Sequence, residues 1–391
     1  MFLNSIQKMY LVHFLITLHF FGAVLIPFFT DFGGLNFTQI MILQSWFTFW
    51  MFVLEVPTGT IADFFGRKIS IAASGIMGAI AAIVYVSAPN FYIFLLAEFL
   101  WAAAAALLSG ADTALIYDTL KQEKREKESK NILSRYESFG LAGILVAAPI
   151  GSIIAANFGV VAPMIIMVIP FSLAALLVLT VPEPKIFRAL KRENYRKILQ
   201  EGFMFFAKHK ILKLFALDVA IVGMAGYIMI WLFQPLLKAA GVPIFWYGFM
   251  QAAFVLGEIL VLNNIHKMEN IFGGKKNYLF GSALLIGLGF FAAAITKSVP
   301  IVFLSIMAVG SLALTRNPII SSYANKYIPT AKRATILSAM SMARRITVAV
   351  SQLAVGFIVD IFSLNHALLA LGGLIIAFAF FSKIEEKMLK D

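Results

Sequence analysis

Eight charged side chains fall within long apolar stretches of the sequence. Five are acids and three are arginines: Glu55, Glu98, Asp112, Asp218, Glu258, Arg316, Arg344 and Arg345. A charge in hydrocarbon is costly, so such groups usually pair with one another, face a water-filled cavity or take part in function. Because the acids outnumber the arginines, at least two acids lack an arginine partner. A desolvated carboxyl of this kind can bind and release a proton near neutral pH.

Glu98 and Asp112 are the two acids best placed for proton binding. They are fourteen residues apart, which on a continuous helix returns to nearly the same face, so both could face one cavity. Asp112 has Arg316 at a similar predicted depth, whereas the bases nearest the depth of Glu98 are loop lysines. We therefore predict Glu98 as the proton carrier and Asp112 as its relay or the substrate-side partner. The alternative is that Glu98 stays neutral permanently and donates a hydrogen bond.

The surrounding sequence is typical of an integral membrane protein. Of its 391 residues, 61% are apolar and 13% are charged, whereas soluble domains are about half apolar. One crossing takes about 20 apolar residues, and the apolar runs predict twelve helices. Their spans are 9–30, 38–62, 68–87, 90–118, 132–156, 161–181, 212–237, 245–265, 278–296, 299–325, 334–359 and 365–382.

Basic residues are concentrated in one set of connections. Of 32 Lys and Arg residues, 27 lie in the terminal segments, in the even-numbered connections or at the span ends beside them, two lie in the opposite loops and three lie deeper inside spans. Because positively charged loops stay in the cytoplasm, we predict a multi-pass cell-membrane protein with cytoplasmic N- and C-termini. The same loops explain the net charge of +12 without a nucleic-acid partner.

The longest connector divides the chain into two halves of six helices. We predict an N-terminal half over 1–181, a cytoplasmic amphipathic basic linker over 182–211, and a C-terminal half with a short tail over 212–391. Spans five and eleven both begin Ile-Leu-Ser, each after a basic loop. This repetition indicates a duplicated six-helix unit, the symmetry on which many membrane carriers are built.

The connection between spans two and three contains the most specific motif. From Gly59 to Lys68 it reads Gly-Thr-Ile-Ala-Asp-Phe-Phe-Gly-Arg-Lys. It resembles the signature loop of the major facilitator superfamily, with both glycines, the acid and the basic pair in register. A simple glycine turn with cytoplasmic charges would explain Arg67 and Lys68 but not Asp63. We expect Gly59 to permit close helix packing and Gly66 to permit a tight turn.

The resemblance implies a gating contact at the cytoplasmic side. In this superfamily an acid at the inner end of helix four completes an acid–base–acid cluster, which here would be Asp63, Arg67 and Asp118. Such a contact can break and re-form. The alternative for Asp118 is an ordinary interfacial aspartate. The matching loop of the second half, 266–276, keeps a glycine and bases but not the acid's spacing, so we expect the stronger latch in the first half.

Other kinds of chemistry find little support. The chain has no cysteine, no complete phosphate-binding or dinucleotide motif, and no nucleophile–base arrangement. His13 and His19 are six residues apart and do not converge on a metal, so we interpret them as satisfied or cavity-facing imidazoles. We expect no enzyme activity, no metal and no cofactor, with a proton gradient as the energy source. Asn36 or Thr38 should cap the second span.

By this resemblance the chain is an all-α transporter with twelve transmembrane helices, working by alternating access between two pseudo-symmetric halves. Helices one, four, seven and ten line the cavity in this family, which would expose Glu98, Asp112, Asp218 and Arg316. We expect a monomer in the lipid bilayer that exports an amphipathic or cationic small molecule by proton antiport. One alternative is an organic-anion carrier in which Arg316 binds the anion. Another is a membrane sensor on the same fold that does not transport.

The remaining embedded charges are expected in the cavity or in ion pairs. Helices two and eleven face each other in this family, so Glu55 could pair with Arg344 or Arg345. The two arginines are about 100° apart on one helix, so only one should face a given neighbour. Glu258 could likewise fix packing or face the cavity. Aromatic residues that could contact an apolar substrate are Phe14, Phe21, Trp101, Tyr227 and Trp231.

Overall fold

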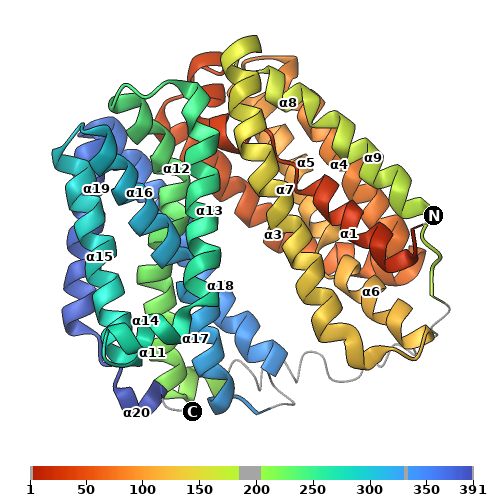
Figure 1. The fold of residues 1–391 in the computed structure, drawn as a ribbon. Helices are drawn as coiled ribbons and strands as arrows, with labels where there is room; N and C mark the ends of the chain where they lie inside the picture. The colour runs from red at the N-terminus through yellow and green to blue at the C-terminus, as the bar shows by residue number, and fades with distance from the viewer. Residues whose placement is uncertain (1–2, 185–203, 330–332, 390–391) are drawn as a thin grey trace. The chain divides into compact units, whose positions relative to one another are not determined.

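The computed structural model describes residues 3–184, 204–329 and 333–389, and no β-strand occurs in these ranges (Figure 1). The first part forms α1 (Ser5–Ile16), η1 (Gly22–Val24), α2 (Leu25–Pro27), η2 (Phe28–Phe32), α3 (Phe37–Phe65), α4 (Arg67–Ser87), α5 (Phe91–Leu108), α6 (Ala111–Gln122), η3 (Glu126–Glu128), α7 (Ser129–Phe158), α8 (Ala162–Ile166) and α9 (Val168–Leu179). Most of the predicted linker, 185–203, lies outside the described residues.

The later part of the chain is also helical. It forms α11 (Lys210–Asp218), η4 (Val219–Gly223), α12 (Met224–Ala239), η5 (Ile244–Trp246), α13 (Tyr247–Asn263), α14 (Ile265–Ile271), α15 (Lys275–Ile295), α16 (Val299–Leu314), α17 (Arg316–Ala324), η6 (Asn325–Tyr327), α18 (Arg333–Ile361), α19 (Leu364–Phe381) and α20 (Glu386–Leu389). Within the described ranges, ten helical segments are long and apolar enough to cross a membrane. Each overlaps one predicted span, and α18 covers the predicted span 334–359.

The predicted span 9–30 is not one continuous helix. After α1 the Thr17 hydroxyl donates to the carbonyl oxygens of His13 and Phe14, at 2.8 and 3.0 Å, and the helix ends. The chain resumes as the short elements η1 and α2, and η2 is a π-helical turn directly after Pro27. Apolar composition therefore did not predict that this span is interrupted.

The fourth span is also broken, and this corrects the argument that put Glu98 and Asp112 on one face. α5 ends at Leu108, Gly110 has a φ of 76°, and α6 begins at Ala111. A left-handed residue, which glycine adopts readily, resets the direction of the helix. Glu98 lies before the break and Asp112 after it, so their separation in sequence no longer fixes their relative direction.

The second span begins as its sequence predicts. The Asn36 side chain accepts from the backbone N–H of Gln39 at 2.8 Å, and the Gln39 side chain accepts from the N–H of Asn36 at 3.0 Å. This reciprocal pair is a capping box, which satisfies two N–H groups that have no partner within the helix. The predicted capping role is confirmed for Asn36.

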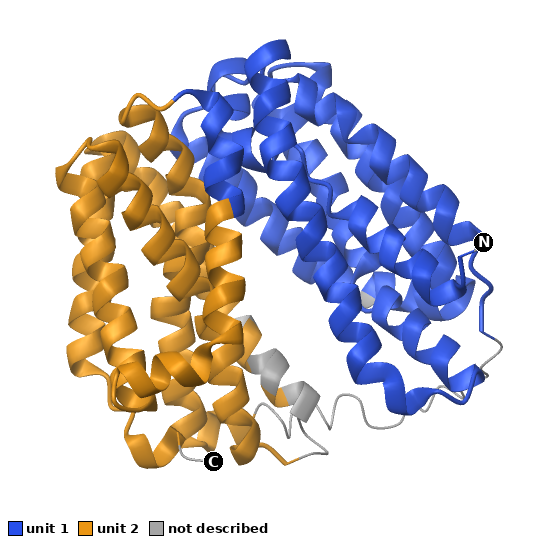
Figure 2. Cartoon of the chain, in the orientation of Figure 1, with its two compact units in different colours: residues 1–188, 243–252 blue, residues 189–242, 253–391 orange. Residues whose placement is uncertain are grey.

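The chain divides into two compact units, drawn in different colours in Figure 2. Unit 1 contains residues 1–188 and 243–252, and unit 2 contains 189–242 and 253–391. The segment 243–252 therefore differs from the predicted half 212–391. Gly248 explains this, because a Cβ there would overlap the backbone of Ala148 in α7, and the Ser152 hydroxyl donates to the Phe245 carbonyl at 2.8 Å.

Candidate functional site

Arg67 and Asp118 meet inside unit 1. Arg67 begins α4, Asp118 lies in α6, and both side chains are buried. The guanidinium of Arg67 donates to the carboxylate of Asp118 and to the carbonyl oxygen of Ala114. Asp63 is exposed, and the described residues show no hydrogen bond to its side chain. The structure thus brings together the base and one of the two acids of the expected cluster.

The two glycines of the signature loop differ in what they do. Gly66 has a φ of 102°, a conformation that residues with a Cβ rarely adopt. The predicted tight turn is therefore confirmed. A Cβ on Gly59 would meet no atom within 4 Å. Among the described residues of unit 1, no neighbouring helix approaches its α-carbon, so the close packing predicted at Gly59 is not seen within this unit.

We expect Arg67→Ala to weaken the state in which α4 and α6 are held together. Cysteines introduced on the helices predicted to line the transport cavity should then become more accessible to a membrane-impermeant reagent from the cytoplasm, and turnover should slow. The absence of native cysteine makes this labelling direct. Lys68→Ala is the matched control, because the recorded contact of Lys68 is through its backbone N–H. If Arg67→Ala leaves labelling and flux unchanged, the motif does not gate.

Glu183 caps α4, a role that sequence reasoning missed. Its two carboxylate oxygens accept from the backbone N–H groups of Arg67 at 2.8 Å and of Lys68 at 3.0 Å. A carboxylate at a helix N-terminus satisfies free N–H groups and complements the helix dipole. A Cβ on Gly66 would lie 3.2 Å from this carboxyl carbon, so the glycine also makes room for the cap.

The second half repeats this arrangement in unit 2. Glu386 accepts from the backbone N–H groups of Lys275 at 3.3 Å and Lys276 at 2.7 Å, at the beginning of α15. Gly274 precedes them with a φ of 132°. In each half, then, a glycine with positive φ and two basic residues begin the third span, and a glutamate after the sixth span caps it. This correspondence is independent support for a duplicated unit.

Removing the cap should lower the stability of unit 1 modestly. We expect Glu183→Ala to lower the free energy of unfolding by about 1 kcal/mol, the usual effect of losing an N-terminal cap. The measurement is thermal or chemical unfolding of the purified protein in detergent, with the exposed Glu126→Ala as the control. Equal stability of the two variants would show that the carboxylate does not hold the beginning of α4.

In the second half, the side chain that contacts loop 266–276 is a tyrosine hydroxyl. In the first half, the corresponding contact to the signature loop is made by the carboxylate of Asp118. The Tyr323 hydroxyl of α17 donates to the carboxylate of Glu269 in α14. Lys275 Nζ lies 5.2 Å from the centre of the Tyr323 ring and donates to the Leu389 carbonyl at 3.1 Å. Glu269, Lys275 and Tyr323 border a cavity of about 390 Å³. Loop 266–276 thus makes its own contacts, with Glu269 as the buried acid.

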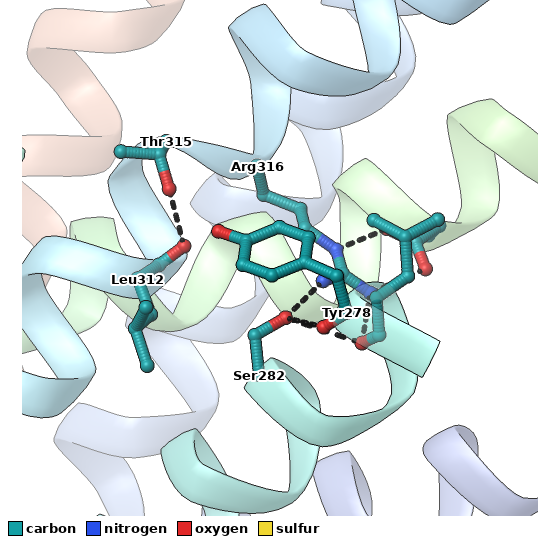
Figure 3. A network of polar contacts seen from close by, with 7 residues as sticks. Tyr278, Ser282, Leu312, Thr315 and Arg316 are labelled. Carbon is teal, nitrogen blue, oxygen red and sulfur yellow. Dashed lines mark hydrogen bonds and ion pairs between the residues drawn. The ribbon is translucent and has the colours of Figure 1, made fainter. Parts of the chain in front are cut away.

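Asp218 and Arg316 form a buried ion pair in unit 2. Arg316 Nε and Nη2 donate to the two carboxylate oxygens of Asp218, at 2.6 and 3.0 Å. The guanidinium also donates to the Ser282 hydroxyl at 2.7 Å and to the Leu279 carbonyl at 2.8 Å (Figure 3). Asp218 is 1% exposed and Arg316 is 2% exposed. The expectation that these two side chains are exposed to the cavity is therefore wrong in this structure.

Both members of the Asp218–Arg316 pair lie next to irregular turns in their helices. Asp218 is followed directly by η4, a π-helical turn, and Arg316 begins α17 at the junction after Thr315. Thr315 bonds to the Leu312 carbonyl at 2.8 Å, beside Arg316 in Figure 3. Turns of this kind often occur at functional positions in helices.

Glu98 lies in a buried cluster of uncharged partners in unit 1. It accepts a hydrogen bond from Gln44 Nε2 of α3 at 2.8 Å and one from the hydroxyl of Tyr85 of α4. Glu98 is 3% exposed, so the expected exposure to a cavity is wrong here as well. The described residues record no basic group bonded to this carboxyl.

Asp112 belongs to a different cluster, between α1, α6 and α7. It accepts from the Tyr136 hydroxyl at 2.6 Å and from the Thr113 N–H at 2.6 Å, and it is 8% exposed. Like Glu98, it is buried rather than open to a cavity. Arg316, the partner considered for it from depth alone, instead contacts Asp218. The two predicted proton sites therefore belong to separate networks.

The other predicted charges are less enclosed. Glu55 is exposed in unit 1, and Glu258 is partly buried in unit 2. The Arg344 guanidinium lies 4.8 Å from the centre of the Tyr227 ring, and its buried Nε has no hydrogen-bond partner among the described residues. Arg345 is partly buried. A pairing of Glu55 with either arginine stays a prediction.

Comparison with known proteins now identifies the family. The sequence profile of the Major Facilitator Superfamily matches residues 9–351. The chain is a member of the major facilitator superfamily. As in other members, its transporter fold is all-α with twelve transmembrane helices, and the protein crosses the membrane several times. Sequence comparison with curated proteins finds no match.

Solved structures of superfamily transporters share this fold. The nucleoside transporter NupG superposes with a TM-score of 0.84 at 16% identity, covering 100% of both chains. A POT family transporter in complex with 5-aminolevulinic acid gives 0.75 at 15% identity, covering 98% of this chain and 96% of the other. A D-xylose-proton symporter gives 0.69 at 14% identity, covering 99% of each. These similarities establish the fold of this superfamily member, a transporter.

Proposed function

We propose that this transporter exports an amphipathic or cationic small molecule in exchange for protons. The observation that carries the proposal is the state of two buried acids of unit 1 other than Asp118, which contacts Arg67. Glu98 and Asp112 are hydrogen-bonded to tyrosine, glutamine and backbone groups, and the described residues pair neither with a base. Buried carboxyls without a cation can bind protons, or can neutralise a cationic substrate.

The proposed orientation places both termini in the cytoplasm. It is supported by the 27 basic residues in the terminal segments, in the even-numbered connections or at the span ends beside them. In this orientation the Arg67–Asp118 contact and the Glu183 and Glu386 caps lie on the cytoplasmic side. A monomer with no cofactor suffices for this mechanism, because the proton gradient drives the cycle.

Flux in sealed vesicles tests the proposal. Purified protein is reconstituted into liposomes, and the movement of ethidium, as a cationic probe, is followed with and without an imposed pH difference. We expect the probe to accumulate on the side of lower pH. This accumulation should be abolished by a protonophore and absent from protein-free liposomes. Movement that ignores the pH difference would contradict proton coupling, and binding without movement would indicate a sensor.

A second candidate is an organic-anion carrier, and one observation favours it. Arg316 is saturated by Asp218, Ser282 and a backbone carbonyl, so it is a poor choice for binding an anion. Arg344 has a buried Nε without an acceptor among the described residues and lies over the Tyr227 ring. Uptake of a carboxylate such as benzoate that depends on Arg344 but not on Glu98 or Asp112 would favour this candidate.

A further inference from the structure

His13 completes a cluster of ionisable side chains around Asp112 in unit 1. Its imidazole from α1 stacks on the phenol ring of Tyr136 from α7, with ring centroids 3.9 Å apart and planes 21° from parallel. The Tyr136 hydroxyl in turn donates to the Asp112 carboxylate of α6 at 2.6 Å. Tyr136 therefore contacts both the imidazole and the carboxylate, and joins three helices.

The two nitrogens of His13 have different surroundings. Nε2 lies 3.9 Å from a carboxylate oxygen of Glu137, the residue after Tyr136. Nδ1 is buried and has no hydrogen-bond partner among the described residues. Of the two predicted states of this imidazole, satisfied or cavity-facing, the described residues do not support the satisfied one at Nδ1. A buried polar atom without a partner is costly and calls for a reason.

The approach of His13 to α7 depends on a glycine. A Cβ at Gly140, one turn after Tyr136, would overlap the imidazole at Nε2. Gly140 therefore allows the ring to pack against α7, which gives this glycine of α7 a specific structural role. This contact keeps Nε2 on the side of Glu137 and the face of the imidazole ring against the ring of Tyr136.

Exposure falls along the cluster. The Glu137 side chain is 67% exposed, that of His13 is 13% exposed, and Asp112 as a whole residue is 8% exposed. The series runs from a carboxylate that solvent reaches, through an imidazole, to a buried acid. Glu137, His13 and Asp112 lie in α7, α1 and α6, so the cluster spans three helices.

We propose that His13, Tyr136 and Asp112 form a proton-binding site, with Glu137 as the group through which protons enter and leave. The proposal rests on the proton coupling proposed above and names residues for it. Around His13, α7 supplies Glu137 and Tyr136 and α6 supplies Asp112, while the neighbouring α9 contains no ionisable side chain. The site therefore holds two carboxylates, one phenol and one imidazole.

Each transfer moves one proton and no other atom. A protonated Glu137 gives its proton to His13 Nε2 through one bridging water, because the 3.9 Å between the two groups is too long for a direct hydrogen bond. Glu137 becomes a carboxylate, and the imidazole becomes an imidazolium. The imidazolium then lies over the Tyr136 ring, whose π-face attracts a cation, and 3.9 Å from the carboxylate of Glu137. When the imidazolium loses this proton, the proton returns to Glu137 by the same path. Tyr136 contacts both His13 and Asp112. A charge on His13 is therefore expected to change the hydrogen bond between Tyr136 and Asp112 and the packing of α1 on α7.

The first test separates coupling from transport. In reconstituted liposomes, His13→Gln is expected to lose ethidium accumulation driven by a pH difference while keeping ethidium exchange at equal pH. Tyr136→Phe keeps the stacked ring but removes the hydroxyl bond to Asp112, and should also impair driven accumulation. The matched control is His366→Gln, because His366 is exposed and bonds to Ser363 at the N-terminus of α19. Driven accumulation by His13→Gln at the wild-type level would overturn the proposal.

The second test does not need transport. Nuclear magnetic resonance of ¹⁵N-histidine-labelled protein identifies the His13 signal as the one missing from His13→Gln. We expect this signal to report protonation of the imidazole within the pH range over which the protein stays folded, and its pH midpoint to move in Asp112→Asn but not in the exposed Glu126→Gln. A signal that shows a neutral imidazole over this whole range would refute the site. A pH midpoint that is the same in Asp112→Asn as in the wild type would also refute it. If the signal titrates as expected while no pH-driven flux is found, the site exists and the proposed antiport is wrong.

Discussion

Replacing Arg316 with methionine should lower the free energy of unfolding of unit 2 by about 3–5 kcal/mol, because it leaves Asp218 buried without its counter-charge. Asp218 is 1% exposed, and Arg316 supplies both of its ionic hydrogen bonds. The measurement is the thermal unfolding of the purified protein in detergent. Arg125→Met is the control, since Arg125 makes exposed ion pairs with Glu123 and Glu128, which contribute little.

The double variant Asp218→Leu with Arg316→Met makes the prediction specific. Removing both charges leaves no unpaired ion, so much of the lost stability should return. A double variant as unstable as Arg316→Met alone would mean that the bonds to Ser282 and Leu279, rather than the ion pair, hold this region. Unchanged stability of Arg316→Met, together with lost anion uptake, would return Arg316 to the role of a substrate-binding residue.

Much of the fold could be predicted because a segment that crosses a membrane must be mostly apolar and helical, and both properties can be read from local sequence. Length and apolarity gave the spans, since every backbone polar group must be satisfied within a helix in lipid. Asn36 and Gln39 form their capping box within four residues, so local pattern was sufficient. The breaks after Ile16 and at Gly110 were missed because they lie inside apolar runs, and hydropathy alone does not distinguish a bent span from a straight one.

The partners of the embedded charges could not be read from depth alone. Arg316 pairs with Asp218 from a helix 98 residues earlier, and depth along a helix does not fix the direction of a side chain. Asp112 was matched to Arg316 by the same reasoning and instead bonds to Tyr136. The helix-capping role of Glu183 had only one signal in the sequence, an acid between two prolines directly after the sixth span.

The two halves preserve backbone contacts better than side-chain contacts. Glu183 and Glu386 cap the third span of each half through main-chain N–H groups, which any sequence supplies. The side-chain latch differs, because Arg67 meets a carboxylate in α6 whereas Lys275 lies over the phenol ring of Tyr323 in α17. A duplicated chain can therefore keep its caps while its latches diverge, which fits the degenerate motif of loop 266–276.

Glu98→Gln should abolish ethidium accumulation driven by a pH difference while leaving ethidium exchange at equal pH intact. Glutamine keeps an oxygen that can accept from Gln44 and Tyr85, so the cluster should stay folded, but it has no proton to release. The measurement compares driven accumulation and exchange in the same liposomes, with the exposed Glu126→Gln as control. Driven accumulation by Glu98→Gln at the wild-type level would show that Glu98 is a permanently neutral acid within its cluster. Asp112→Asn would then be the decisive variant, because Asp112 would be the remaining buried acid of unit 1 that could carry the proton.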